Sequence, residues 1–307
     1  MGLHVSEPVD VVAIGSSVML MSYAPLLAWE QEGIVTYNNS WHALTAESIL
    51  YATKEVYKHQ SPEVLVIDLK PFQYGDGLPG SEEAAIRNFS DSIPYSWNRL
   101  DFILDVVPDR VDEAGNKNPL NYIFDIAKYH SRWTLIGASA VRSWNNSTRS
   151  IAKGFNYNTN IGTTNGFLDH SMVTTEHVPT EYMVGVFEDF LAYCKTLDSE
   201  ILFVVTPYSE PLEHREYYNY YERRILEYGY NYMHMNDYQD EININYDTDF
   251  YDGGHLNLDG AMKYTAFFSS YLKETYDLIN RKDDPIYRQW HEDYSIWIAE
   301  IRTINNN

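Results

Sequence analysis

The sequence predicts an α/β fold with three layers, in which helices cover both faces of a central, mostly parallel sheet of five strands. Five short runs rich in branched residues recur along the chain with helical patterns between them, and this alternation is typical of a parallel sheet. The runs are apolar at successive positions, as expected for strands that are buried on both faces. With 307 residues and a hydrophobic fraction of 44%, the chain is long enough to fill one large core.

The predicted elements alternate along the chain. Strands are expected at residues 9–15, 33–38, 63–69, 201–207 and 230–236. Helical periodicity predicts helices at 18–30, 45–60, 82–89, 97–105, 119–129, 181–197, 211–228 and 258–279, with a last amphipathic stretch at 285–302. Because no repeat or Pro-rich linker interrupts this order, we expect a single domain over residues 1–307.

One segment, at about residues 130–180, breaks the pattern. Periodicity is lost there, and Asn, Thr, Gly and Ser dominate in NNSTRSIAKGFNYNTNIGTTNG. A long irregular segment inside a compact domain is usually a binding loop or a lid. We therefore expect an insertion that lies over one end of the sheet.

Composition excludes several classes of function. The formal net charge of −22 disfavours nucleic acid and anionic lipid as partners, because both carry negative charge. The single cysteine, Cys194, cannot form a disulfide framework or a cysteine-based zinc site. No apolar run approaches the roughly 20 residues that span a bilayer. The first ten residues do not form a signal peptide, so an extracytoplasmic location requires a segment upstream of residue 1, and a cytoplasmic location is expected otherwise.

A strand followed by small hydroxyl residues is the first candidate for chemistry. The stretch DVVAIGSSVML carries Gly15, Ser16 and Ser17 at the carboxyl end of the first predicted strand, where open parallel sheets bind their ligands. A glycine for the turn and a serine as helix cap would explain this stretch by local structure alone. Alternatively, one of the serines is a nucleophile, and the chain must then supply a base.

The best candidate for that base is His255, in DTDFYDGGHLNLDGAMKYT. Asp252 precedes it by three residues, so the carboxylate can turn back to the imidazole Nδ1 and leave Nε2 free to accept a proton from a serine. The two intervening glycines make this turn sterically easy. The sequence then carries its catalytic residues in the order Ser, Asp, His.

These motifs resemble those of the SGNH (GDSL-like) hydrolase superfamily. Gly15-Ser16-Ser17 is similar to the Gly-Asp-Ser block, and Asp252-Gly253-Gly254-His255 to the Asp-x-x-His block. Together with YHSRW at 129–133, the second motif resembles a bacterial branch of the DltD and AlgJ type. The resemblance implies an SGNH/flavodoxin-like fold, with Ser17 as nucleophile and Ser16 as the fallback. His255 is then general base and acid, and Asp252 orients it.

The resemblance further implies a serine esterase or O-acyltransferase that acts on small acyl esters, acetyl above all, of a carbohydrate or cell-envelope polymer. No cofactor and no metal is expected. Some members of this branch act beside a membrane-bound O-acyltransferase, so such a protein is an expected partner. The rival expectation is a catalytically degenerate glycan-binding protein or partner subunit.

The blocks that stabilise the oxyanion depart from the family pattern. After the second strand, YNNSWHALT lacks the expected glycine, so we expect a backbone N–H of Ser40 or Ala43, or a side-chain amide of Asn38 or Asn39, to take its place. After the third strand, Asp68 occurs where a Gly-x-Asn-Asp motif is expected. An ionised carboxylate there would oppose a developing oxyanion, and the loss of one donor typically costs about 100- to 1000-fold in rate.

Other residues are candidates for contact with the substrate. Arg132 suits a carboxylate or phosphate, and Trp133 can stack on a sugar ring; equally, Arg132 can pair with a surface carboxylate and Trp133 can pack in the core. His42 lies near the second block. Basic residues for an anionic substrate cluster only at Arg132, Arg142, Arg149 and Lys153.

The acidic residues around position 250 do not match the pattern of a calcium-binding loop. Counted from Asp247, a calcium loop requires Gly at its sixth position and Glu at its twelfth, and the chain has Asp252 and Leu258 there. We therefore expect these acids to form turns and a helix cap. The sequence leaves open whether water or a sugar hydroxyl would resolve an acyl-serine intermediate, and it leaves the oligomeric state open.

Overall fold

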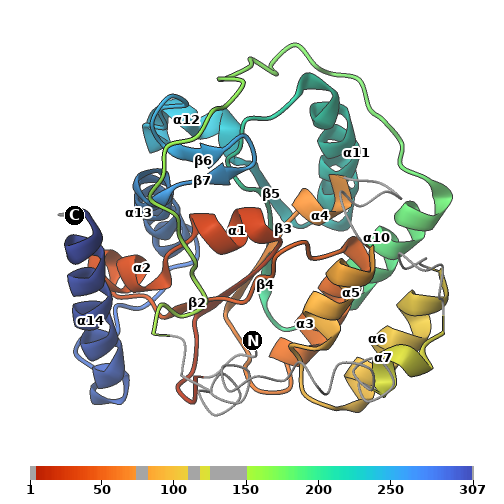
Figure 1. Cartoon of the computed structure of the whole chain (residues 1–307), viewed down its shortest axis with the longest axis horizontal. Helices are drawn as coiled ribbons and strands as arrows, with labels where there is room; N and C mark the ends of the chain where they lie inside the picture. Colours follow the sequence, from red (N-terminus) through yellow and green to blue (C-terminus); the bar gives the residue numbers. More distant parts are fainter. Residues whose placement is uncertain (1–4, 74–81, 110–117, 125–150, 306–307) are drawn as a thin grey trace, which may run out of the picture.

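A parallel sheet of five strands forms the centre of the protein. The computed structural model describes residues 5–73, 82–109, 118–124 and 151–305 (Figure 1). The strands are β1 (Val11–Ile14), β2 (Thr36–Asn38), β3 (Val64–Asp68), β4 (Glu200–Val205) and β5 (Asn231–His234). They pair in the order β2-β1-β3-β4-β5, and every pair is parallel. All five predicted strands are therefore confirmed, with ends that differ by at most three residues.

Helices cover both faces of this sheet, which confirms the predicted three-layer α/β fold. The α-helices are α1 (Ser17–Ser22), α2 (Pro25–Glu32), α3 (Ala46–Val56), α4 (Lys70–Gln73), α5 (Glu82–Ser90), α6 (Trp97–Val106), α7 (Leu120–Ile123), α10 (Glu181–Cys194), α11 (Leu212–Tyr228), α12 (Gln239–Ile242), α13 (Leu258–Thr275) and α14 (Arg288–Asn305). Alternate strand residues face opposite layers. Val12, Leu65 and Phe203 belong to the core cluster that includes residues of α3, α10 and α14, whereas Val11 and Val66 belong to a second cluster with residues of α1 and α13.

Some elements differ from the prediction. The expected helix at 18–30 is two helices, because Pro25 disfavours helical backbone at the residue before it and begins α2. The expected helix at 119–129 is described only as α7, since residues 125–129 lie outside the described part. A short antiparallel hairpin of β6 (Phe250–Asp252) and β7 (His255–Leu256) was not expected from the sequence.

The described part of the insertion, residues 151–180, contains no regular element, and we call it the strap. In Figure 1 it is the light green chain that runs past α1 and over the top of the view to α10. Two main-chain hydrogen bonds join the strap to β2 and α1. Asn38 N–H in β2 donates to Lys153 O in the strap (3.0 Å), and Asn156 N–H in the strap donates to Leu20 O in α1 (3.1 Å). The strap is therefore fixed to the same end of the sheet as the Gly15–Ser17 turn, which we call the nucleophile turn because it carries the candidate nucleophile.

Within the described residues, every helix is too short or too polar to cross a membrane.

The last helix, α14, packs against α2. A buried ion pair joins it to the strap, because Lys153 Nζ lies 2.5 Å from Asp293 and both side chains are 2% exposed. The Lys153 ammonium also lies over the Trp290 ring, 4.4 Å from its centroid.

Replacement of Asp293 tests how strongly this ion pair holds the strap. Asp293→Ala leaves a buried ammonium without its carboxylate, so we expect the free energy of unfolding in urea to fall by about 3–5 kcal/mol. The matched control is Glu292→Ala on the same helix. Its partner Arg288 is exposed, so we expect a loss below about 1 kcal/mol. Equal losses for the two variants would contradict a stabilising role for the buried pair.

Candidate active site

The candidate nucleophile lies where the order of the sheet reverses. β1 has β2 on one side and β3 on the other, and such a switch point is the usual ligand site of an open parallel sheet. The chain leaves β1 through Gly15 and Ser16 and enters α1 at Ser17. At Gly15 a Cβ would lie 2.6 Å from Asp68 Cβ and 2.7 Å from Met19 Cβ, so only glycine allows β1, β3 and α1 to pack this closely.

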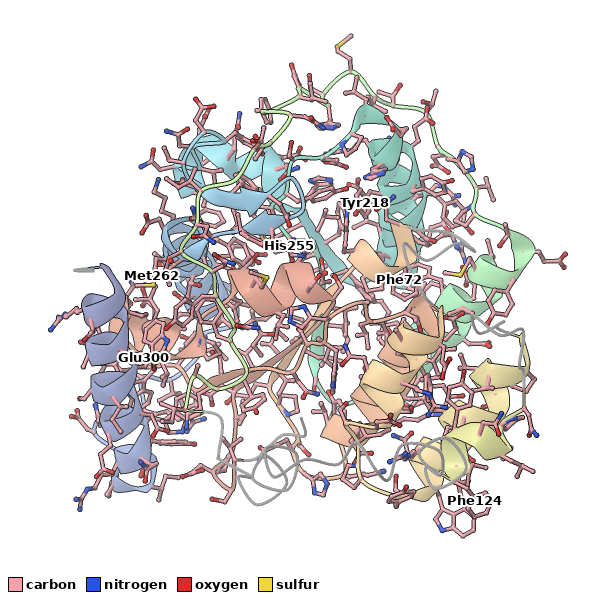
Figure 2. The ribbon with its side chains drawn as sticks, in the orientation of Figure 1. Phe72, Phe124, Tyr218, His255, Met262 and Glu300 are labelled. Atoms are coloured by element: carbon pink, nitrogen blue, oxygen red, sulfur yellow. The ribbon has the colours of Figure 1, made fainter. Side chains whose placement is uncertain are left out.

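A chain of hydrogen bonds connects three side chains at this point. Ser17 Oγ lies 2.7 Å from His255 Nε2, and His255 Nδ1 lies 2.8 Å from Asp252 Oδ1. Figure 2 shows His255 near the centre of the view, beside α1. The His255 and Asp252 side chains are 24% and 48% exposed, so the site is open to solvent. The structure thus brings together the three residues that the sequence predicts, although Ser17 and His255 are 238 positions apart.

The hairpin fixes the Asp252–His255 turn. Gly254 N–H donates to Asp252 Oδ1 at 2.8 Å. The carboxylate oxygen that is hydrogen-bonded to His255 Nδ1 is therefore also held by a backbone N–H. From the strap, Gly162 N–H donates to Phe250 O at 2.9 Å. A Cβ at Gly162 would lie 1.7 Å from Tyr251 O, so the strap can approach this closely only through glycine. No local sequence signal marks Gly162, because its role depends on a segment about 90 positions later.

Two backbone N–H groups remain candidates for stabilising an oxyanion. Ser17 begins α1, so its N–H has no acceptor within the helix, and it has none among the described residues. Ala43, in the loop after β2, has left-handed backbone with φ 53°, which is uncommon for a residue with a Cβ and occurs often at functional sites. The Ala43 N–H likewise has no acceptor in the described part of the chain.

Ser40 is less suitable than Ala43. Asn39 N–H donates to Ala13 O at 2.7 Å and Trp41 N–H donates to Gly15 O at 3.1 Å, so the pairing with β1 continues past β2. Because alternate N–H groups of an extended strand point to opposite edges, the Ser40 N–H points away from β1. The Trp41 bond also ties the loop that carries Ala43 to the nucleophile turn.

The prediction that the Asn38 amide replaces an oxyanion donor is wrong. Asn38 Nδ2 donates to Met19 O at 2.8 Å and to Tyr23 O at 2.9 Å, so it satisfies carbonyls at the end of α1. The Asn39 side chain is 6% exposed and forms no hydrogen bond with the described residues, so its role as a donor stays a prediction.

Asp68 is fully buried beside the nucleophile turn. Its Oδ1 accepts hydrogen bonds from Thr206 N–H (3.3 Å) and Thr206 Oγ1 (3.0 Å), and its Oδ2 has no hydrogen-bond partner among the described residues. Burial raises the pKa of the carboxyl to about 6, although hydrogen bonds from Thr206 and the charge of Lys70 act to lower it. Burial also lowers the pKa of the Lys70 ammonium to about 7.

The remaining candidates fall into three groups. His42 lies in the loop after β2, and partial burial together with the nearby His255 lowers its pKa. Arg132 and Trp133, with Arg142 and Arg149, lie outside the described residues. The expectation that Lys153 serves an anionic substrate is wrong, because its ammonium is buried against Asp293.

The acidic residues around position 250 have only part of the structural roles expected of them: Asp247 and Asp249 lie in turns, but none of the acids is the cap of the following helix. Asp249 accepts a hydrogen bond from Asn245 N–H and pairs with Lys263 at 2.6 Å. The cap of α13 is Asn257, whose side chain accepts from Gly260 N–H. In the described ranges, no three His, Cys, Asp or Glu side chains are arranged to hold a metal ion.

Neither a protein-family model nor a curated protein matches the chain. The resemblance to the SGNH hydrolases therefore rests on the two sequence motifs.

Replacement of Asp68 tests the raised pKa through stability. A carboxyl whose pKa is about 6 when folded and about 4 when unfolded binds its proton more tightly in the folded state, so ionisation destabilises the fold as pH rises. Relative to wild type, Asp68→Asn should therefore gain up to about 3 kcal/mol in unfolding free energy between pH 4 and pH 7. Denaturant titrations at both pH values measure this gain, with exposed Asp101→Asn as the control. A difference between Asp68→Asn and wild type that is the same at both pH values would contradict the burial of an ionisable Asp68.

Proposed function

We propose that the protein is a serine esterase or O-acyltransferase that acts on small acyl esters, most simply acetyl esters, of a carbohydrate or cell-envelope polymer. The observation that carries the proposal is the unbroken hydrogen-bonded chain from Ser17 through His255 to Asp252. A serine is a weak nucleophile unless a base accepts its proton as it attacks, and an imidazole at 2.7 Å that is held by a carboxylate meets this need.

The proposed reaction proceeds through an acyl-serine. Ser17 Oγ attacks the ester carbonyl carbon while His255 Nε2 accepts the hydroxyl proton, and Asp252 stabilises the imidazolium that forms. The N–H groups of Ser17 and Ala43 donate to the negative oxygen of the tetrahedral intermediate. When the intermediate collapses, the C–O bond to the leaving alcohol breaks, and the alcohol oxygen takes the proton from His255.

The acyl group then leaves Ser17 by the reverse chemistry. His255 removes a proton from an incoming hydroxyl, whose oxygen attacks the acyl carbon. The bond between that carbon and Ser17 Oγ then breaks, and Oγ takes the proton back from His255. Water as the incoming group gives hydrolysis, and a sugar hydroxyl gives transfer. The carbohydrate and the acetyl group in this proposal rest on the resemblance to the SGNH superfamily.

The departures at the oxyanion blocks favour a second candidate function. The segment after β2 lacks the glycine that the family has there, and Asp68 occurs where a Gly-x-Asn-Asp motif is expected and is buried beside the nucleophile turn. A catalytically degenerate glycan-binding protein, or a partner subunit of a membrane O-acyltransferase, would tolerate both changes. Such a protein has no need for a reactive serine.

A fluorophosphonate that modifies activated serines separates these candidates. We expect intact-mass analysis to show one adduct on wild type and on Ser16→Ala, and none on Ser17→Ala or His255→Ala. Asp252→Asn keeps the nucleophile but favours the wrong imidazole tautomer, so we expect it to slow labelling by up to about 10⁴-fold. An adduct that survives in Ser17→Ala and disappears in Ser16→Ala would move the nucleophile to Ser16. No adduct on folded wild type would favour the degenerate protein.

A further inference from the structure

A pair of polar side chains, His42 and Asn156, lies near the proposed catalytic histidine. Asn156 Nδ2, from the strap, lies 3.4 Å from His42 Nε2, in the loop after β2, and both residues are exposed. The charge of His255 acts on His42, so this pair lies within electrostatic range of the catalytic imidazole. The proposed chemistry does not use either side chain.

The backbones that carry the pair are tied to the nucleophile segment itself. Asn156 N–H donates to Leu20 O in α1, three residues after Ser17. The residue before His42, Trp41, donates its N–H to Gly15 O, two residues before Ser17. Asn88, in α5, also holds this loop, because its Nδ2 donates to His42 O. The pair is therefore held in a fixed place relative to Ser17, although its two members come from segments 114 positions apart.

The hydrogen-bonding groups of the pair suit an uncharged oxygen. With Asn156 Nδ2 as donor to His42 Nε2, the imidazole proton is assigned to Nδ1, and Asn156 Oδ1 is occupied by Tyr157 N–H at 2.9 Å. Two N–H groups are then left to donate, namely His42 Nδ1–H and the second hydrogen of Asn156 Nδ2. Because partial burial and His255 lower the pKa of His42, the imidazole stays neutral near pH 7 and offers no charge to an anion.

We propose that His42 and Asn156 form a subsite that binds a hydroxyl group of an uncharged, polyhydroxylated acyl carrier beside Ser17. This inference rests on the proposed function and deepens it, because it assigns a substrate class to the same site. The net charge of −22 also favours an uncharged acyl carrier, because it disfavours the approach of an anionic one. His42 and Asn156 are then specificity-determining residues, and the ester chemistry itself does not require them.

Kinetics with two esters test the subsite. The probes are 6-O-acetylglucose, which has free hydroxyls, and p-nitrophenyl acetate, which has none. Loss of one neutral hydrogen bond weakens binding by about fivefold to tenfold. We therefore expect His42→Ala and Asn156→Ala each to raise KM for the sugar ester by this factor, with kcat and the rate on p-nitrophenyl acetate within about twofold of wild type. His42→Gln, which keeps an N–H donor, should recover part of the loss. His59→Ala, at an exposed histidine in the turn after α3, is the matched control.

Binding to the inactive Ser17→Ala protein separates the subsite from the reaction. We expect 6-O-acetylglucose to bind this variant, as measured by NMR titration, and His42→Ala in the same background to weaken binding by the same factor. If wild type neither hydrolyses the two esters nor forms an acyl-Ser17 from them but this binding difference is found, the proposed function fails and the subsite stands. Unchanged sugar-ester kinetics, an equal loss on both esters, or no binding that depends on His42 would each overturn the subsite.

Discussion

The hydrogen bond between Ser17 and His255 is the contact on which the arrangement of the site depends, because its two residues are supplied from opposite ends of the chain. β1 and the Gly15 turn deliver the serine, and the β6–β7 hairpin ahead of α13 delivers the histidine. α1 packs against both α13 and β7, so the same contacts that build one layer of the fold also hold the two side chains in reach. The bond is therefore a product of the whole α/β framework and not of either motif alone.

A cost in electrostatic energy accompanies this framework. The close packing of Gly15 against Asp68 buries a carboxyl group next to the turn that carries the candidate nucleophile. An ionised carboxylate there would act against negative charge on an oxyanion. Burial raises the pKa of Asp68 to about 6 and lowers the pKa of the nearby Lys70 ammonium to about 7. Near pH 7 the Asp68 carboxyl is therefore mostly ionised, and the partly protonated Lys70 offsets only part of its negative charge.

Local patterns explain why much of the fold and the central site could be predicted from the sequence. Branched apolar runs mark each strand, and the three-residue spacing of Asp252 and His255 indicates a carboxylate that can turn back to its imidazole. The remaining features depend on distant parts of the chain. The Asn38 amide donates to a carbonyl of α1. Ala43 has a left-handed backbone conformation, which an alanine does not predict. Asn156 contacts His42 only because the strap crosses the end of the sheet. No periodicity or spacing encodes such contacts.

The most direct test of the central claim is to trap the acyl-serine. Wild-type protein is mixed with p-nitrophenyl acetate, the release of nitrophenol is followed in a stopped-flow instrument, and an acid-quenched sample is digested for peptide mass spectrometry. If Ser17 is the activated nucleophile, a burst of nitrophenol close to one equivalent of protein should appear, with one acetyl group on the peptide that contains Ser17 and on Ser17 within it. A folded protein that gives neither a burst nor an acetylated Ser17 would contradict the assignment of Ser17, His255 and Asp252 as a catalytic unit.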